Sequence, residues 1–196
     1  MKKLFSTTLI LLGIIFSINA NTNIDLSLSK IEWTGKKITG SHNGTINLTS
    51  GNLDIKNKEI LGGEFNIDMN SIICSDLENE NSNSRLINHL KSDDFFSVEK
   101  FPTSKIVINK VVKLKENKNG WTHNIDADLT IKGTTKEIVF PCNMKEESKD
   151  RMSFYAEITV DRSQYNVQYG STTFFPNIAD KAIDNDMLFK VKLLTK

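Results

Sequence analysis

Apolar and polar residues alternate one by one through most of this chain, and this period of two constrains the fold more than any other feature. The alternation is cleanest over residues 125–132, where every second side chain is apolar. Successive side chains of a β-strand point to opposite faces of its sheet, so this pattern predicts a strand with one buried face. Similar segments recur from residue 30 to residue 193, separated by turn signals such as Ser50-Gly51-Asn52.

The predicted strands number roughly eight to ten, and no helix-length segment separates them. Parallel neighbours require a crossover of about a dozen or more residues, so these strands are expected to pair antiparallel. Antiparallel strands with one apolar face form a sandwich or a barrel, and a barrel leaves no unpaired edge. An eight-stranded barrel either fills its interior with side chains or encloses one small ligand.

Residues 86–102 break the alternation. The apolar side chains at positions 86, 87 and 90 fall on one face of a helical turn. Ser84 is placed to cap this turn and Ser92 to cap a second one, and an aromatic cluster that includes Phe95 and Phe96 follows. The polar residues before Ser84 are expected to form a loop. A helical insert near residues 84–97 must bury its apolar face, and the open end of a closed sheet offers the surface.

The first twenty residues have the pattern of a secretory signal peptide. Lys2 and Lys3 precede a mostly apolar run over residues 4–18, and Ala20 is a small residue at a suitable cleavage point. The run is too short for a membrane span, and an uncleaved N-terminal anchor is the alternative. We therefore expect cleavage near Ala20, and a single domain over residues 21–196 that is periplasmic or secreted.

The charge of the chain argues against one class of partner. The formal net charge of the full chain is +1, and it falls to about −1 when the two signal-peptide lysines are removed. No more than two basic residues follow one another. Proteins that bind nucleic acid neutralise phosphates with clustered Lys and Arg, so no nucleic acid is expected as a partner.

The residues that commonly perform catalysis or bind metals are scattered. His42, His89 and His123 have neither HxH nor HExxH spacing, and the chain contains no GxSxG elbow, P-loop or GxGxxG loop. Cys74 and Cys142 match no CxxC or metal-ligand pattern. No catalytic residue and no metal site are predicted. The two cysteines are either a disulfide of an exported protein or two small half-buried apolar side chains.

Four motifs occur together in a characteristic order: residues 40–45 (GSHNGT), residues 89–96 (HLKSDDFF) with Phe101-Pro102 after them, residues 128–133 (DLTIKG) and residues 161–165 (DRSQY). In this order and spacing they resemble the YceI-like family of bacterial exported proteins, over essentially the whole of residues 21–196. The chain departs from the family pattern at Gln164-Tyr165-Asn166, where an aromatic residue followed by glycine is common. This departure lies in a connection between strands. If members of the family bind a ligand, the departure affects which polar head group this chain would accept.

The resemblance implies an all-β fold, namely a lipocalin-like eight-stranded antiparallel β-barrel with the short helical insert near residues 84–97. It also implies that a polyisoprenoid, either an isoprenoid quinone or a polyprenyl lipid, binds inside the barrel, with no other cofactor. The protein would then be an exported, non-catalytic carrier or sequestering protein that contacts a membrane transiently. The oligomeric state stays open, and a homodimer is one alternative.

The candidate ligand-binding residues are apolar side chains expected to face the lumen: Phe65, Ile67, Leu129, Ile131, Phe154, Ile158 and Phe189. The insert adds a lid or a static plug that consists of Leu86, Leu90, Phe95 and Phe96. The polar residues near enough to contact a head group are Arg85, His89 and Lys91. Two other hypotheses remain, an enzyme that acts on a bound quinone or lipid and a filled barrel that serves as an interaction module at the cell envelope.

Overall fold

The computed structural model describes residues 20–56, 59–115, 120–149 and 151–196. The predicted signal peptide lies outside these residues, except for Ala20. In chain order the elements are β1 (Ala20–Asn23), β2 (Lys30–Lys37), β3 (Gly40–Lys56), β4 (Glu59–Cys74), α1 (Glu80–Lys91), β5 (Thr103–Lys113), β6 (His123–Ile131), β7 (Thr134–Ser148), β8 (Arg151–Asp161), η1 (Arg162–Tyr165), η2 (Ala179–Lys181) and β9 (Asp186–Leu194). Among the described residues, no helix is both long and apolar enough to span a membrane.

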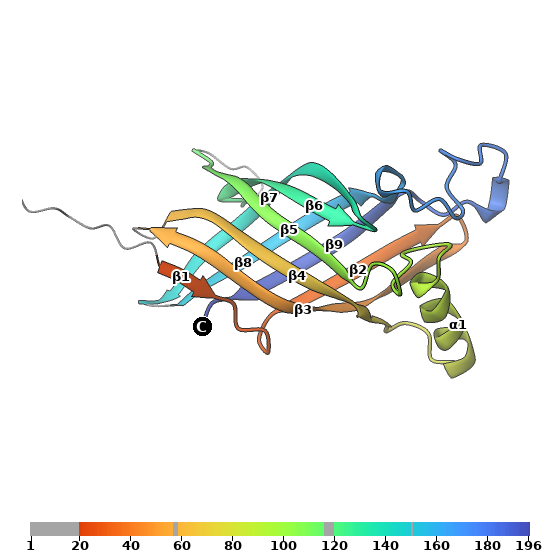
Figure 1. The fold of residues 1–196 in the computed structure, drawn as a ribbon, viewed down its shortest axis with the longest axis horizontal. Coiled ribbons are helices and arrows are strands. Elements are labelled where there is room, and N and C mark those ends of the chain that lie inside the picture. Colours follow the sequence, from red (N-terminus) through yellow and green to blue (C-terminus); the bar gives the residue numbers. More distant parts are fainter. Residues whose placement is uncertain (1–19, 57–58, 116–119, 150) are drawn as a thin grey trace, which may run out of the picture.

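The strands form one antiparallel sheet that closes on itself (Figure 1). Eight strands follow one another around the ring in the order β3-β2-β9-β8-β7-β6-β5-β4, and the pairing of β4 with β3 closes it. The short strand β1 pairs with β3 at residues 52–55, beyond the part of β3 that pairs with β2. The predicted eight-stranded antiparallel barrel is confirmed, and the sandwich is excluded.

The period-two pattern decides which side chains face the interior. In β6, the residues at positions 125, 127, 129 and 131 are buried, and their neighbours are half-buried. Strand β3 is 17 residues long, and its register with β4 shifts at three places. Bulges of this kind bend a strand and increase its twist, so the long strands can wrap around the barrel.

Helix α1 begins earlier than the sequence pattern predicted. Its N-cap is Asn79, whose side chain accepts a hydrogen bond from the Ser82 backbone N–H at 3.0 Å, so the prediction of a cap at Ser84 was wrong. Asn and Ser are weak helix formers, and the pattern therefore favoured a loop. The Asn83 side chain secures this first turn by donating hydrogen bonds to the carbonyls of Cys74 and Leu77, both at 3.0 Å.

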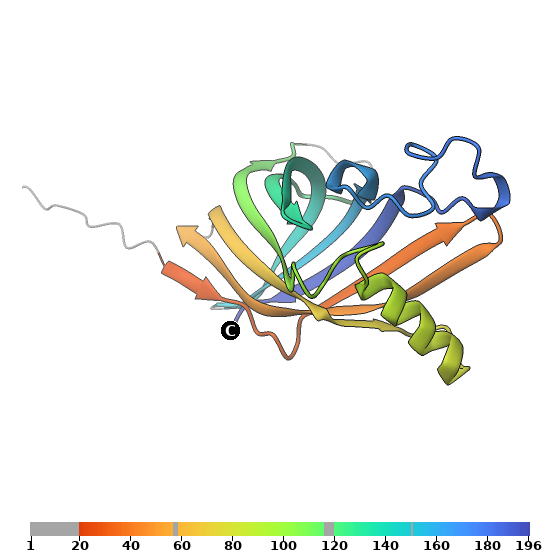
Figure 2. The ribbon, with the colours of Figure 1, turned by 45° about the vertical axis from the view of Figure 1, so that its right-hand side comes forward.

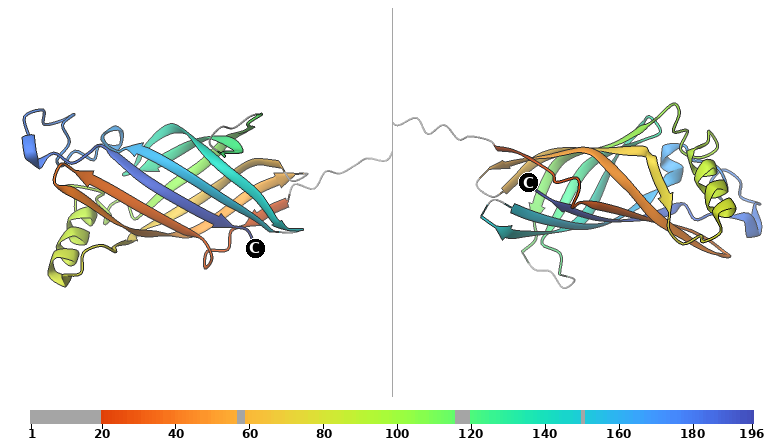
Figure 3. Two further views of the ribbon diagram at one scale, coloured as in Figure 1. Left: turned by 180° about the vertical axis from the view of Figure 1, so that it is seen from behind. Right: turned by 90° about the horizontal axis from the view of Figure 1, so that it is seen from below.

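Residues 92–100 form a series of turns instead of a second helical turn capped by Ser92. Ser92 is the C-cap of α1, where its backbone N–H bonds to the carbonyl of His89. The turns bury Phe95, Phe96 and Val98. Both α1 and these turns lie at one end of the barrel, as does the segment between β8 and β9, whereas β1 and the C-terminus lie at the other end (Figures 2 and 3).

Strands β3 and β4 approach each other very closely at Gly44, which pairs with Cys74. A Cβ atom on Gly44 would lie 1.8 Å from the carbonyl oxygen of Ile73 and 2.9 Å from Cζ2 of Trp33. The same carbonyl accepts a hydrogen bond from Trp33 Nε1 at 3.1 Å. Backbone and indole therefore occupy the space that any side chain at this position would need.

We predict that Gly44→Ala lowers the free energy of unfolding by roughly 1–3 kcal/mol, because the added methyl group forces the backbones of β3 and β4 apart. Urea denaturation followed by circular dichroism measures the change. Gly35→Ala is the matched control, since a Cβ atom there meets nothing within 4 Å. Equal losses in the two variants would contradict this account of the strand contact.

Candidate ligand-binding lumen

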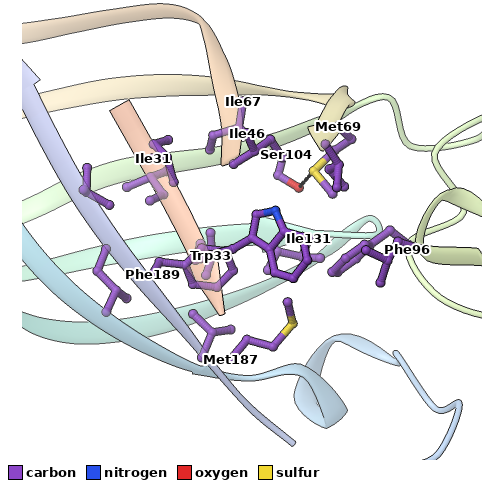
Figure 4. A pocket seen from close by; sticks show the side chains of 17 residues that line it. Ile31, Trp33, Ile46, Ile67, Met69, Phe96, Ser104, Ile131, Met187 and Phe189 are labelled. Atoms are coloured by element: carbon purple, nitrogen blue, oxygen red, sulfur yellow. Dashed lines mark hydrogen bonds between the residues drawn. The ribbon is translucent and has the colours of Figure 1, made fainter. Parts of the chain in front are cut away.

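The interior of the barrel contains two neighbouring apolar cavities. The outer cavity, of about 90 Å³, lies toward α1 and is lined by Leu90 and Phe96 from the insert and by side chains of the strands (Figure 4). The inner cavity, of about 70 Å³, lies farther along the barrel. Five residues line both cavities: Ile31, Ile67, Ile106, Ile158 and Val191. The two spaces are therefore parts of one apolar lumen, narrowed at this junction.

The few polar atoms that line the outer and inner cavities either form hydrogen bonds or have a pKa that disfavours ionisation. Ser104 Oγ lies 3.0 Å from the sulfur of Met69, to which it donates a hydrogen bond (Figure 4). In the inner cavity, burial raises the pKa of the Cys142 thiol to about 12. Of the described residues that line the outer and inner cavities, none carries a charged side chain. Such a lining suits hydrocarbon and disfavours water.

The size of the cavities limits what enters without rearrangement. Each is smaller than an apolar cavity of about 150 Å³, which suffices for benzene. A longer guest must therefore occupy both cavities and displace side chains at their junction. Methionine is well suited to such repacking because it is unbranched and flexible; Met69 and Met187 line the outer cavity and Met144 the inner one.

A third cavity, the mouth cavity, adjoins the outer one and has a volume of about 90 Å³. It shares Trp33, Leu90 and Met187 with the outer cavity. In contrast to the outer and inner cavities, it is lined in part by acidic and basic side chains, which include His89, Arg162 and Asp184. The His89 ring packs against Tyr169, with 4.4 Å between the ring centroids. Its Nε2 atom is buried and has no hydrogen-bond partner within the described parts of the chain.

The structure brings the predicted lumen residues together. The seven residues predicted from the strands all line the outer or the inner cavity. The outer cavity is lined by Leu129, Ile131 and Phe189, and the inner cavity is lined by Phe65 and Phe154. Both cavities are lined by Ile67 and Ile158. Of the four from the insert, Leu90 and Phe96 line the outer cavity, and Leu86 and Phe95 line the mouth cavity. Their roles as ligand contacts stay predictions.

The predicted head-group residues are not grouped at the mouth. His89 lines the mouth cavity, whereas Arg85 and Lys91 are not among the described residues that do so. Arg85 is exposed to solvent, and Lys91 Nζ donates a hydrogen bond to the carbonyl of Asn70 at 2.7 Å. Of the three, His89 is thus the residue positioned to meet a ligand.

Arg162 organises this end of the barrel, although the sequence analysis included it only as part of the motif at residues 161–165 and gave it no role. Its side chain is buried, and its guanidinium donates hydrogen bonds to four backbone carbonyls, those of Val167, Tyr169, Ile183 and Asp184, at 2.8–3.1 Å. It also lies over the ring of Phe95, 5.3 Å from the centroid. Burial lowers the pKa of Arg162. Arg162 therefore joins the connection between β8 and β9 to the aromatic cluster of the insert.

We predict that Arg162→Lys lowers the free energy of unfolding by roughly 2–4 kcal/mol, because one ammonium group cannot serve carbonyls on several sides and leaves some of them unpaired. Chemical denaturation measures the loss, and limited proteolysis should show earlier cleavage within residues 166–185. Arg85→Lys, at an exposed site, is the control and should change neither. Unchanged protection of this segment in Arg162→Lys would refute the positioning role.

Comparison of the sequence with known proteins identifies related chains. A UPF0312 protein of Photorhabdus laumondii is 27% identical over 109 residues, which are 53% of this chain and 50% of that one. A UPF0312 protein of Shewanella denitrificans is 30% identical over 105 residues, 54% of this chain and 49% of that one. The chain thus spans about half the length of the curated relatives it matches.

Comparison of the fold identifies similar solved structures. BcnA of Burkholderia cenocepacia superposes with a TM-score of 0.70 at 18% identity, covering 88% of this chain and 99% of that one. A polyisoprenoid binding domain from Saccharophagus degradans, implicated in plant cell wall breakdown, superposes with a TM-score of 0.62 at 13% identity, covering 91% and 99%. At these identities the likeness shows a shared fold.

The family assignment rests on a match along nearly the whole domain. The model of the YceI-like domain matches residues 23–193, a range that includes all eight strands of the ring, with only the last residue of β9 outside it, as well as α1. The four sequence motifs fall within the same range. The chain therefore belongs to the YceI-like domain family.

Proposed function

We propose that this protein is an exported carrier or sequestering protein that holds one polyisoprenoid chain, an isoprenoid quinone or a polyprenyl lipid, inside its barrel. The observation that carries the proposal is the continuous apolar lining of the outer and inner cavities. The Saccharophagus degradans domain, which shares the fold, is described as polyisoprenoid binding. Export is proposed from the signal-peptide pattern of residues 1–20.

The energetics suit a flexible hydrocarbon chain. Burial of one CH₂ group contributes roughly 0.8 kcal/mol, so a five-carbon isoprene unit contributes on the order of 3 kcal/mol before ordering costs. The free energy from burying a few such units exceeds the roughly 8 kcal/mol that micromolar binding requires. This holds even after the loss of conformational freedom on binding offsets part of that free energy. Apolar contacts distinguish one methylene from the next poorly. Chain-length preference should therefore follow the length of the lumen.

The mouth cavity is the proposed place for the polar end of the ligand. A chain that fills the lumen from the α1 end leaves its head group beside His89, whose Nε2 atom lacks a partner within the described structure. A buried ring nitrogen without a partner is unfavourable, and a ligand carbonyl or hydroxyl within hydrogen-bonding distance would satisfy it. Arg162 would act indirectly, by holding Phe95 and the surrounding connection in place.

The lining favours a carrier over the two other hypotheses. An enzyme acting on the bound chain needs a reactive polar group in the lumen. Ser104 is already bonded to the sulfur of Met69, and burial raises the pKa of the Cys142 thiol to about 12, which disfavours its reactive thiolate form. A filled barrel would hold no internal space, but the outer and inner cavities are both present. We therefore propose binding without chemical change of the ligand.

We predict that organic extraction of the purified protein releases an isoprenoid detectable by mass spectrometry.

We also predict that Ile158→Phe restricts the length of the chains that the protein binds. Ile158 lines both cavities, so a larger side chain narrows the junction between them. Displacement of a fluorescent lipid by polyprenols of graded length measures this. Affinity for long chains should fall at least about tenfold, the loss expected when even half an isoprene unit is excluded.

Val139→Phe is the matched control for Ile158→Phe, because Val139 lies on the outside of the barrel with 62% of its surface exposed. It should leave the length preference unchanged. Thermal unfolding of both variants checks that the barrel remains intact. A protein that purifies empty and takes up neither quinone nor polyprenol would overturn the proposal.

We also propose that the mouth end touches a membrane when the ligand transfers. Tyr169, Phe174 and Phe175 belong to the connection between β8 and β9, with 48%, 38% and 49% of their surfaces exposed. This connection lies at the same end of the barrel as α1 (Figure 2). Aromatic side chains insert readily into the interface of a bilayer. Contact at this end would place the bilayer next to the mouth cavity, where an apolar chain can leave the lipid without crossing water.

We predict that Phe174→Ser combined with Phe175→Ser slows transfer of a quinone from phosphatidylcholine vesicles by about tenfold, because two partly exposed rings no longer insert. The transfer rate is followed by fluorescence quenching. The control combines Leu61→Ser with Val139→Ser, which removes two exposed apolar side chains from the barrel wall. Equal slowing by both pairs would count against a docking role for the mouth end.

A further inference from the structure

His42, Cys74 and Asp76 form a cluster that the proposed lipid binding does not use. One potential ligand atom from each residue lies within 4.8 Å of the other two. His42 Nδ1 is 2.8 Å from Asp76 Oδ2, and Cys74 Sγ donates a hydrogen bond to Asp76 Oδ1 at 3.3 Å. His42 also lines the mouth cavity, so the cluster lies at the rim of the mouth.

The backbone holds the three residues in place. His42 lies near the start of β3, and Cys74 is the last residue of β4. Where these two strands meet, the Ser75 N–H donates to the Asn43 carbonyl at 2.8 Å, and the Asn43 N–H donates to Asp76 Oδ1 at 2.7 Å. The Asn83 side chain fixes the carbonyl of Cys74 from the side of α1. The cluster is therefore part of the rigid closure of the barrel.

Burial differs among the three groups in a way that suits an ion arriving from solvent. Cys74 is 7% exposed, whereas the side chains of His42 and Asp76 are 31% and 27% exposed. The sulfur thus forms the base of the cluster, and the imidazole and carboxylate stand above it. An ion arriving from solvent would therefore meet the more exposed imidazole and carboxylate before the buried sulfur.

We propose that His42, Cys74 and Asp76 bind one divalent transition-metal ion, with zinc as the best match, and leave a fourth coordination position to water or another ligand. Thiolate, imidazole and carboxylate are the three ligand types that zinc takes in proteins, and three protein ligands with one open position are common for it. Calcium and magnesium prefer oxygen ligands alone, and this mixed set disfavours them.

The geometry needs only small changes to accept the ion. Metal–ligand bonds of about 2.0–2.3 Å in a tetrahedron place the ligand atoms about 3.3–3.7 Å apart. The separations in the cluster begin at 2.8 Å and stay within 4.8 Å, so side-chain rotations suffice. Binding transfers the thiol proton of Cys74 to solvent, and thiolate and carboxylate together balance the two positive charges. Asp76 Oδ1 keeps its bond to the Asn43 N–H, while Oδ2 turns to the metal.

Titration of the purified full-length protein with zinc, followed by calorimetry, tests the proposal. One ion per chain should bind, with no comparable binding of calcium or magnesium. Cobalt serves as a second probe, because a cobalt–thiolate bond gives a near-ultraviolet charge-transfer absorption. Cys74→Ser should abolish that absorption and weaken zinc binding at least about tenfold, since the thiolate is lost. Serine keeps a donor to Asp76, so the fold should persist, and circular dichroism checks this.

Two matched variants separate this site from the other cysteine and from another histidine. Cys142→Ser changes the buried cysteine of the inner cavity, and His123→Ala changes a histidine on β6. Both should bind zinc and cobalt as the unmodified protein does, whereas His42→Ala should weaken both. Failure of the unmodified protein to bind zinc, or a cobalt–thiolate absorption that survives Cys74→Ser and disappears in Cys142→Ser, overturns the proposal. Both readouts are independent of lipid content.

Discussion

Closure of the sheet between β3 and β4 is the constraint on which the rest of this structure depends. Without that pairing, both strands would be exposed edges, and the apolar faces of all eight strands would have no common interior. The closure requires very close contact at Gly44, where no side chain fits beside the carbonyl of Ile73. It also brings His42 and Cys74 together, although 31 residues separate them in the sequence.

A closed barrel still has two open ends, and this protein covers one of them with segments that are not strands. Helix α1 contributes Leu90, and the turns after it contribute Phe95 and Phe96, all of them buried. A buried guanidinium is stabilised here by four backbone carbonyls and an aromatic ring, so Arg162 links the insert to the β8–β9 connection. The ring contact between His89 and Tyr169 joins the same two segments. The same groups form the wall of the mouth, so the stability of this end and access to the lumen are coupled.

The lumen is apolar but narrow, and this combination favours a thin, flexible guest. Isoleucine and valine at the junction are stiff and branched, whereas the methionines on either side adapt easily. A chain of isoprene units has a small cross-section and gains free energy with each unit buried. Ionisable side chains flank the lumen at both ends, Lys113 and His123 beyond the inner cavity and His89 at the mouth. The reason to place the polar end of the proposed ligand at the mouth is His89 Nε2, which is buried without a partner among the described residues. The proposed metal site lies outside this path, at the rim.

The sequence by itself determined the strands, their antiparallel order and the identity of the side chains that face inward, because the period of two assigns each residue to one face whatever its partner strand. It also located the aromatic insert, although it placed the start of the helix at Ser84 instead of Asn79, since a cap and packing outweighed weak local propensity. The alternation left a sandwich and a barrel open, and it was the family resemblance that favoured the barrel. Only the tertiary structure decided which strands close the sheet, that space remains inside it, that Arg162 is buried among carbonyls, and that His42, Cys74 and Asp76 meet. These features depend on contacts between residues far apart in the chain, and no local pattern encodes such contacts.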